Sequence, residues 1–315
     1  MTWQLRRGLP KHFALSFGDA DPASNRTLNE YEELLFLNST PDKLVAIRKT
    51  ELQGELYDTA LIGNQRVSFP RPFVFSLKPT KKHPNVEYAK KLGRLLCLYD
   101  NAGEHFLPGQ DTVGSPVTRH LAQSRVLLFL FDPIQDPRFR KVCMGQSDDP
   151  QFASFARTSR QELIFHEAAD RIRRHTGIAQ IAKHQRPLIV IVTKFDAWSH
   201  LLPALKLRSP VASDERNRCA VDVTYVGEVS SQLRSLLWKH SPEIVSAVES
   251  FAETVLYIPV SATGGKPEKD EKTGMLGIRP CNIHPLWVEV PLLYALCRWQ
   301  QGMIPFLAHP DPPHP

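Results

Sequence analysis

Three short motifs in this sequence carry residue types that could bind a nucleotide. They are Asp100-x-x-Gly103, Thr193-Lys194-Phe195-Asp196 and Ser261-Ala262, and each follows directly on a short apolar run. Open α/β sheets bind their ligands just beyond the carboxyl ends of their strands. If the apolar runs are strands, we expect all three motifs to meet at one edge of the sheet.

The chemistry of these residues suits a guanine nucleotide. The Asp100 carboxylate could hold Mg²⁺ through a water, since Mg²⁺ prefers oxygen ligands, and the Gly103 N–H could approach a γ-phosphate because no Cβ intervenes. Asp196 could accept hydrogen bonds from N1–H and the exocyclic amine of guanine, a pair of donors that adenine lacks. The Lys194 stem could pack over the base, and the Ala262 N–H could meet guanine O6.

The spacing of apolar residues predicts the elements that must position these motifs. Almost continuous apolar runs, as in parallel strands covered on both faces, occur at 73–77, 94–99, 125–131, 187–192 and 254–260. Helical patterns lie at 28–38, 115–124, 160–177, 227–240 and 291–300. The alternation of strands and helices predicts an α/β fold with a mostly parallel sheet. We expect the proline-flanked run 73–77 near a sheet edge, and surface loops at 201–222 and 264–285.

The composition restricts the classes of protein. The chain has 315 residues, a net charge of +6 with scattered basic residues, and five dispersed cysteines. These features give no reason to expect nucleic-acid binding, and they favour reduced thiols in a cytoplasm. The apolar runs are too short for a membrane helix, which needs roughly 20 residues. A zinc site is not expected, because Cys281, His284 and Cys297 form an incomplete ligand set.

The three motifs resemble sequence boxes of a known family. "DNAG", "TKFD" and "SAT" resemble the third, fourth and fifth boxes of the Ras-like GTPases, which are P-loop NTPases. The longer phrases "LYDNAGEHFLPG", "TRHLAQS" and "FLFDPIQDPRFR" are similar to the bacterial double-GTPase proteins of the second type. The resemblance covers about residues 10–300. It implies a three-layer P-loop NTPase-like sandwich that binds GTP or GDP with Mg²⁺ and hydrolyses GTP as a regulatory switch. It also implies protein partners from a bacterial regulatory or conflict system.

The resemblance also implies a domain organisation. Residues 1–303 would form one GTPase-like domain, with an irregular switch-I or insert region at 1–90 and a core containing the three boxes at 91–303. Residues 304–315 are expected to form a proline-rich disordered tail.

The sequence departs from the family pattern at the residues expected to act. Thr193 stands where relatives carry Asn, and its hydroxyl replaces only part of an amide's hydrogen bonding. Glu104 stands where many relatives carry Gln. A carboxylate there would be repelled by the γ-phosphate, and it could orient a water only as an acceptor or act when protonated. His105 could supply a donor. Glu104 and His105 are therefore the candidate catalytic residues.

The largest departure is the lack of G-x-x-x-x-G-K-[ST], the loop that cradles phosphates. We expect the first strand and this phosphate loop to be missing, through truncation or a misplaced start, with 3–13 as the end of the helix that follows the loop. The alternative is a pseudo-GTPase, a scaffold or interaction module without hydrolysis. A third hypothesis, an unrelated nucleotide-binding α/β enzyme, has no support from a G-x-G-x-x-G motif.

The segment after run 125–131 leaves two interpretations open. Asp132 and Asp136 could face the switch region or could cap a helix or a turn. Arg119, Arg138 and Arg140 could act as arginine fingers or form ordinary ion pairs.

Overall fold

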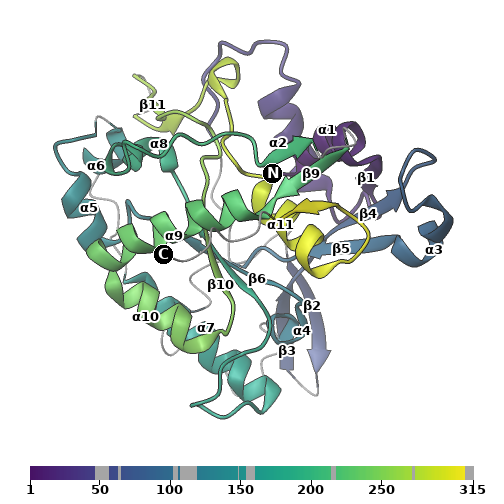
Figure 1. Cartoon of the computed structure of the whole chain (residues 1–315). Coiled ribbons are helices and arrows are strands. Elements are labelled where there is room, and N and C mark those ends of the chain that lie inside the picture. The colour runs from purple at the N-terminus through teal and green to yellow at the C-terminus, as the bar shows by residue number, and fades with distance from the viewer. Residues whose placement is uncertain are drawn as a thin grey trace, which may run out of the picture.

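The computed structural model describes residues 1–46, 57–62, 65–101, 106, 119–147, 149–153, 160–213, 218–271 and 274–308. It is a mixed α/β structure with helices on both sides of its strands (Figure 1). None of the described helices is long and apolar enough to cross a membrane.

A parallel sheet forms the centre of the fold. It consists of β6 (Leu127–Phe131), β7 (Leu188–Val192) and β10 (Val255–Pro259), in the order β10-β7-β6. These strands confirm three of the expected runs. Every residue of β7 is buried, because helices cover both faces of the sheet. Val190 and Val192 face a core that includes α7 (Gln161–Thr176) and α10 (Pro242–Phe251). Ile189 and Ile191 face a second core, to which α9 (Val223–His240) contributes.

An antiparallel sheet continues beside it. The sheet has the order β1-β4-β5, formed by β1 (Leu15–Asp19), β4 (Phe73–Pro79) and β5 (Arg94–Leu98). Helices α1 (Thr2–Phe13) and α11 (Val290–Trp299) share a hydrophobic core with its inner face. The expectation of an edge position for 73–77 is wrong, since β4 lies in the middle. Pro70 and Pro72 precede the strand and Pro79 ends it, so its interior keeps its ladder donors.

Several regions expected to be irregular are ordered. Residues 1–90 contain α1, β1, β4, helix α2 (Arg26–Phe36) and the hairpin of β2 (Tyr57–Ile62) and β3 (Gln65–Pro70). The expected loop 201–222 contains β8 (Val211–Ser213) and the partly buried β9 (Cys219–Asp222). The disordered tail cannot begin at 304, because Ile304 is buried and β13 (Phe306–Leu307) pairs with β9. Residues beyond 308 lie outside the described ranges.

The helical predictions agree with the structure where it can be compared. Helices α2, α7, α9 and α11 occupy the expected segments, and α7 ends at Gly177, which takes a left-handed conformation with φ 69°. The remaining short helices are α3 (Ala89–Leu92), α4 (Arg119–Gln123), α5 (Pro137–Cys143), α6 (Pro150–Ala153) and α8 (Phe195–Trp198). A small ladder of β11 (Glu268–Lys269) and β12 (Leu276–Gly277) lies within the expected loop 264–285.

Candidate functional site

A cavity of about 740 Å³ lies at the carboxyl ends of β5, β6, β7 and β10. Six residues singled out from the sequence line it together, although they come from three distant parts of the chain: Asp100, Thr193, Lys194, Asp196, Ser261 and Ala262. Gly103 and the candidate catalytic residues Glu104 and His105 lie outside the described residues. The structure therefore brings together every predicted site residue that it describes.

The loop after β7 is held firmly in place by hydrogen bonds. The Thr193 N–H and hydroxyl both donate to the Phe131 carbonyl at the end of β6, at 2.9 and 3.2 Å. The buried Trp198 indole N–H donates to the Thr193 carbonyl at 2.7 Å. The Thr193 hydroxyl thus ties two neighbouring strand ends together. Short helix α8 begins directly after this anchor and carries Asp196 to the cavity wall.

Lys194 is tethered at its tip. Its ammonium lies 2.7 Å from an Asp132 carboxylate oxygen and 2.7 Å from the Gln151 side-chain oxygen. Its backbone is left-handed, with φ 56°, which is uncommon for a residue with a side chain. The structure thus adds Asp132 and Gln151 to the site. The sequence suggested Asp132 only as a cap or as a residue facing the switch region, and nothing in the sequence pointed to Gln151.

A second carboxyl group, that of Asp149, lies close enough to Asp196 to interact with it. Burial raises the pKa of Asp149, and the neighbouring Asp196 carboxylate raises that pKa further, while Gln151 and Lys194 oppose the rise. Asp149 is itself buried. The Asp196 carboxylate itself lines the cavity and can only accept hydrogen bonds when ionised, so this end is suited to a ligand that presents donors.

The Ser261 loop is rigid for a steric reason. The Ser261 hydroxyl accepts a 2.8 Å hydrogen bond from the Gly264 N–H, and the Ser261 backbone pairs with Leu286 in both directions. Gly264 has φ +70°, and a Cβ at that position would lie 1.9 Å from the His284 carbonyl oxygen. Only glycine fits there. This turn fixes the backbone of Ala262 at the cavity wall.

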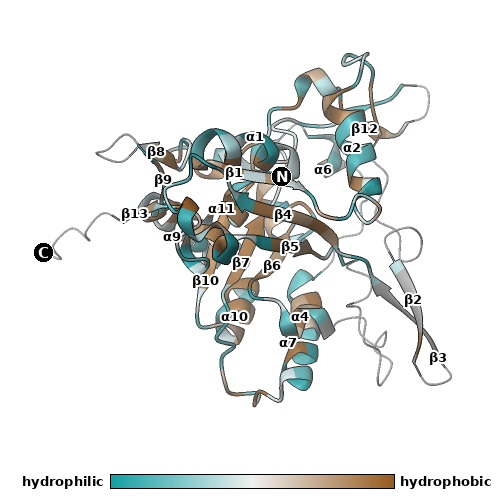
Figure 2. Cartoon of the chain, turned by 90° about the vertical axis from the view of Figure 1, so that its right-hand side faces the viewer, coloured by the Kyte–Doolittle hydropathy of each residue, from teal (hydrophilic) through white to brown (hydrophobic). Residues whose placement is uncertain are grey.

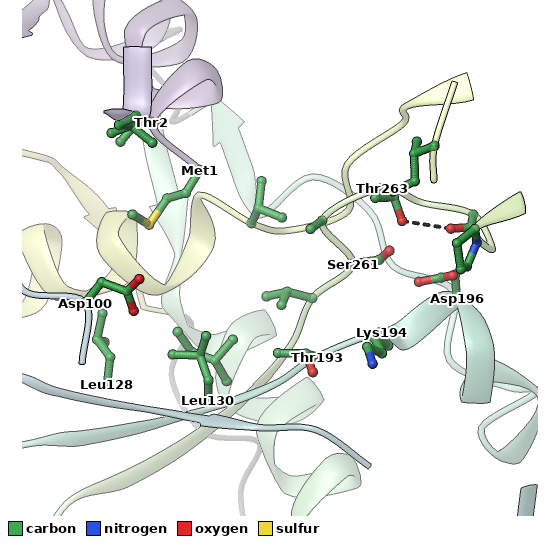
Figure 3. A pocket seen from close by; sticks show the side chains of 18 of the residues that line it. Met1, Thr2, Asp100, Leu128, Leu130, Thr193, Lys194, Asp196, Ser261 and Thr263 are labelled. Atoms are coloured by element: carbon green, nitrogen blue, oxygen red, sulfur yellow. Dashed lines mark hydrogen bonds between the residues drawn. The ribbon is translucent and has the colours of Figure 1, made fainter. Parts of the chain in front are cut away.

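The polar groups of the cavity lie at two ends with an apolar middle. Figure 3 shows Asp100 near Met1 on one side, with Thr193, Asp196 and Ser261 on the other. The apolar Leu130 lies between the two ends, and Leu128 lies beside Asp100 (Figure 3). An elongated ligand with different chemistry at each end would match this arrangement.

The Asp196 end of the cavity fits the base of a nucleotide better than the Asp100 end fits its Mg²⁺ and phosphates. The Asp196 end offers a carboxylate and a fixed backbone turn, which suit a base edge. At the other end Asp100 offers one carboxylate, enough for Mg²⁺ only when waters and phosphates complete its coordination. Among the described lining residues Lys194 is the only lysine or arginine, and its charge is already matched by Asp132. Within the described ranges no three His, Cys, Asp or Glu side chains cluster as a metal site.

The contacts of Asp132, Asp136 and Arg138 show what each side chain does in this structure. Asp132 accepts a hydrogen bond from the Ile134 N–H in its own turn. Asp136 is the N-cap of α5 and is fully buried, and Arg138 pairs with Asp136, Glu162 and Glu243. Asp136 and Arg138 do not line the cavity. These two residues form a structural ion-pair network in this arrangement.

The chain was also compared with known proteins. No family model, no curated protein and no solved structure matches it.

Proposed function

We propose that this chain is a guanine-nucleotide-binding domain of the Ras-like GTPase kind. In this proposal the Asp196 carboxylate accepts hydrogen bonds from N1–H and the exocyclic amine of guanine. The Lys194 stem packs over the base, and the Ala262 N–H donates a hydrogen bond to guanine O6. One observation supports it above all others. Described residues of all three motifs, which follow β5, β7 and β10, line a single cavity, with Asp100 at one end and Asp196 with Ser261 at the other.

The phosphate end of the proposal is incomplete within these 315 residues. The sequence contains no G-x-x-x-x-G-K-[ST] loop. We therefore propose a P-loop NTPase-like sandwich that lacks its first strand and phosphate loop. Asp100 would hold Mg²⁺ through water, and Gly103 would approach the γ-phosphate. Hydrolysis of GTP as a switch would depend on Glu104 and His105, and the partners would be proteins of a bacterial regulatory or conflict system.

A pseudo-GTPase is the second candidate. It is favoured by the charge of the cavity, where the described lining contains two carboxylates, Asp100 and Asp196, but only one lysine, which is already paired. Such a site would repel a triphosphate unless cations came from elsewhere. This protein would keep the fold as a scaffold or interaction module.

Base specificity provides the sharpest test. Titration calorimetry in the presence of Mg²⁺ should detect binding of GDP and no binding of ADP. Asp196→Asn should weaken GDP binding by about tenfold or more, because hydrogen bonds to a charged group contribute about 1.5–3 kcal/mol. The same variant should gain affinity for xanthosine diphosphate, whose base carries an acceptor where guanine carries its amine, since an amide can donate to that oxygen.

The matched control is Asp170→Asn, which makes the same change at a half-exposed residue of α7 that does not line the cavity. It should leave every affinity unchanged. Equal binding of ADP and GDP, or an Asp196→Asn variant that behaves like wild type, would refute the base-reading role. Lack of any nucleotide binding would favour the pseudo-GTPase.

A further inference from the structure

The Lys194 side chain is fixed at both of its ends. At its base the Lys194 backbone takes a left-handed conformation, with φ 56°. A residue with a side chain keeps such a backbone only where its surroundings hold it there. At its tip the ammonium lies 2.7 Å from an Asp132 carboxylate oxygen and 2.7 Å from the Gln151 side-chain oxygen. The apolar stem between these two ends therefore has little freedom to change its rotamer.

Asp132 is itself held by rigid elements. It follows directly on β6, which with β7 belongs to the hydrophobic strands in the middle of the molecule (Figure 2). The buried Gln161 side chain, at the start of α7, accepts a hydrogen bond from the Asp132 N–H at 2.9 Å and donates one to the Asp132 carbonyl at 2.7 Å. The Asp132 carboxylate also accepts a hydrogen bond from the Ile134 N–H at 3.1 Å. Its position is thus fixed by contacts that do not involve Lys194.

Gln151 is held by the buried Asp149. The Gln151 backbone N–H and side-chain amide nitrogen donate to the two Asp149 carboxylate oxygens, at 2.8 and 3.3 Å. The Gln151 side-chain oxygen then accepts the hydrogen bond from Lys194. The reverse orientation of the amide would place an NH₂ group against the ammonium and an oxygen against the carboxylate. Gln151 therefore presents an acceptor to Lys194 in a single orientation.

These contacts decide what Lys194 offers to a ligand. The Asp132 side chain is 15% exposed and does not line the cavity, whereas Lys194 and Gln151 do. Figure 3 shows the Lys194 nitrogen pointing away from Asp196 and Ser261. The positive charge of Lys194 is matched by the Asp132 carboxylate. Beside Asp196, Lys194 therefore presents its apolar stem rather than its charge.

We propose that Asp132 and Gln151 are positioning residues, which hold the Lys194 stem in place as a preformed surface for a guanine base bound at Asp196. Both residues act through the Lys194 ammonium and need not touch the base. The gain is entropic, because a stem that is already ordered loses no rotamer freedom when the base packs on it. This proposal rests on the proposed function, in which Asp196 binds guanine.

A double-mutant cycle tests whether Asp132 acts through Lys194. Asp132→Asn keeps an acceptor for the Ile134 N–H and removes the charge, and Lys194→Met keeps an apolar stem and removes the ammonium. Titration calorimetry with GDP and Mg²⁺ should show about fivefold weaker binding by Asp132→Asn than by wild type. In the Lys194→Met background, the same Asp132 substitution should change the affinity by less than about twofold.

Gln151→Met tests the second positioning residue. Methionine keeps an unbranched side chain of similar length but presents no amide oxygen to Lys194. We expect GDP binding to weaken by about threefold, which is less than for Asp132→Asn because the charged partner remains. This loss should also disappear in the Lys194→Met background.

Asp136→Asn is the matched control. It makes the same change at another carboxylate of the loop after β6, whose charged partner is Arg138 instead of Lys194. It should leave GDP binding unchanged, although it lowers the free energy of unfolding. A loss of affinity that came only from a weakened loop would appear in this control as well.

Amine labelling gives a readout without any nucleotide. Acetylation with a limiting amount of acetic anhydride, followed by mass spectrometry, compares Lys194 with the exposed Lys239 of α9. Lys194 should react about tenfold more slowly than Lys239, because its ammonium must first leave a carboxylate. Asp132→Asn should speed the reaction of Lys194 by about fivefold and leave that of Lys239 unchanged.

Three results would overturn the proposal. They are GDP binding by Asp132→Asn that equals wild type, an Asp132→Asn effect that is just as large in the Lys194→Met background, and equal labelling of Lys194 and Lys239 in wild type. A wild-type chain that binds GDP while these effects are missing refutes the positioning role and leaves the proposed function standing. A wild-type chain that binds no guanine nucleotide refutes both.

Discussion

The buried Asp136 carboxylate offers the sharpest test of how the loop after β6 is held. It accepts hydrogen bonds from the Arg138 and Phe139 N–H groups at the start of α5, both at 3.0 Å. It also accepts one from the buried Ser241 hydroxyl at 3.0 Å and pairs with the Arg138 guanidinium at 2.9 Å. One side chain therefore fixes the start of α5 to the start of α10.

The magnitude follows from what each substitution removes. Asp136→Ala removes the cap, for which about 1 kcal/mol is typical, and one partner of a buried ion pair, for which about 3–5 kcal/mol is typical. Arg138 keeps Glu162 and Glu243 as partners, so we expect a total loss of about 3 kcal/mol in the free energy of unfolding. Asp136→Asn keeps the shape and acceptor oxygen, so we expect about half that loss.

The charge also predicts a pH dependence. Burial alone would raise the pKa of Asp136, but the hydrogen bonds and positive charge of Arg138, with the Phe139 N–H and Ser241, lower it below its ordinary value. A carboxyl with a lowered folded pKa stabilises the protein above its unfolded pKa of about 3.9, and this contribution is lost as the pH falls through the folded pKa. Asp136→Asn should remove that part of the acid destabilisation.

Equilibrium unfolding in urea, followed by circular dichroism at several pH values, measures the loss in free energy of unfolding for Asp136→Ala and for Asp136→Asn. It also measures the pH dependence of that free energy. Asp170→Ala is the control: this half-exposed residue of α7 pairs with Arg173 at 3.4 Å, and its loss should change the free energy of unfolding by less than about 1 kcal/mol. The reasoning is refuted if Asp136→Ala costs less than about 1 kcal/mol, or if the acid destabilisation is the same in wild type and Asp136→Asn.

Two further predictions concern the Ser261 loop and the thiols. Gly264→Ala should destabilise the protein by about 2 kcal/mol or more, because its Cβ would meet a carbonyl oxygen at 1.9 Å, whereas Gly265→Ala, with open space around it, should be nearly neutral in the same urea experiment. Burial raises the pKa of Cys143 to about 11 and of Cys297 to about 12. Alkylation at pH 8 should therefore modify the exposed Cys281 and leave these two thiols intact until the protein unfolds, which mass spectrometry would detect. Rapid labelling of either buried thiol in the folded protein would contradict the packing described for it.

The sequence predicted the elements whose local signal was strong. The continuous apolar runs at 187–192 and 254–260 form parallel strands, as expected for short β-rich runs covered on both faces. Helix α7 was predicted to end at Gly177, and it does, because glycine takes the left-handed turn without strain. The short β9 and β13 were missed. Residues 221–222 and 306–307 are strands because they pair with each other, and a pairing between such distant residues leaves no pattern in the local sequence.

The candidate site also has features that the sequence predicted and features that only the fold revealed. The sequence by itself determined which residues follow the strands, namely Asp100, Thr193 to Asp196 and Ser261 to Ala262, because strand ends are marked by an abrupt change from apolar to polar residues. Only the tertiary structure decided that they line one cavity and that Lys194 is tethered to Asp132 and Gln151. The physical reason is the separation in sequence between the residues that interact. Apolar periodicity acts between neighbours in the chain, whereas cavities, ion pairs and strand edges form between segments far apart in sequence.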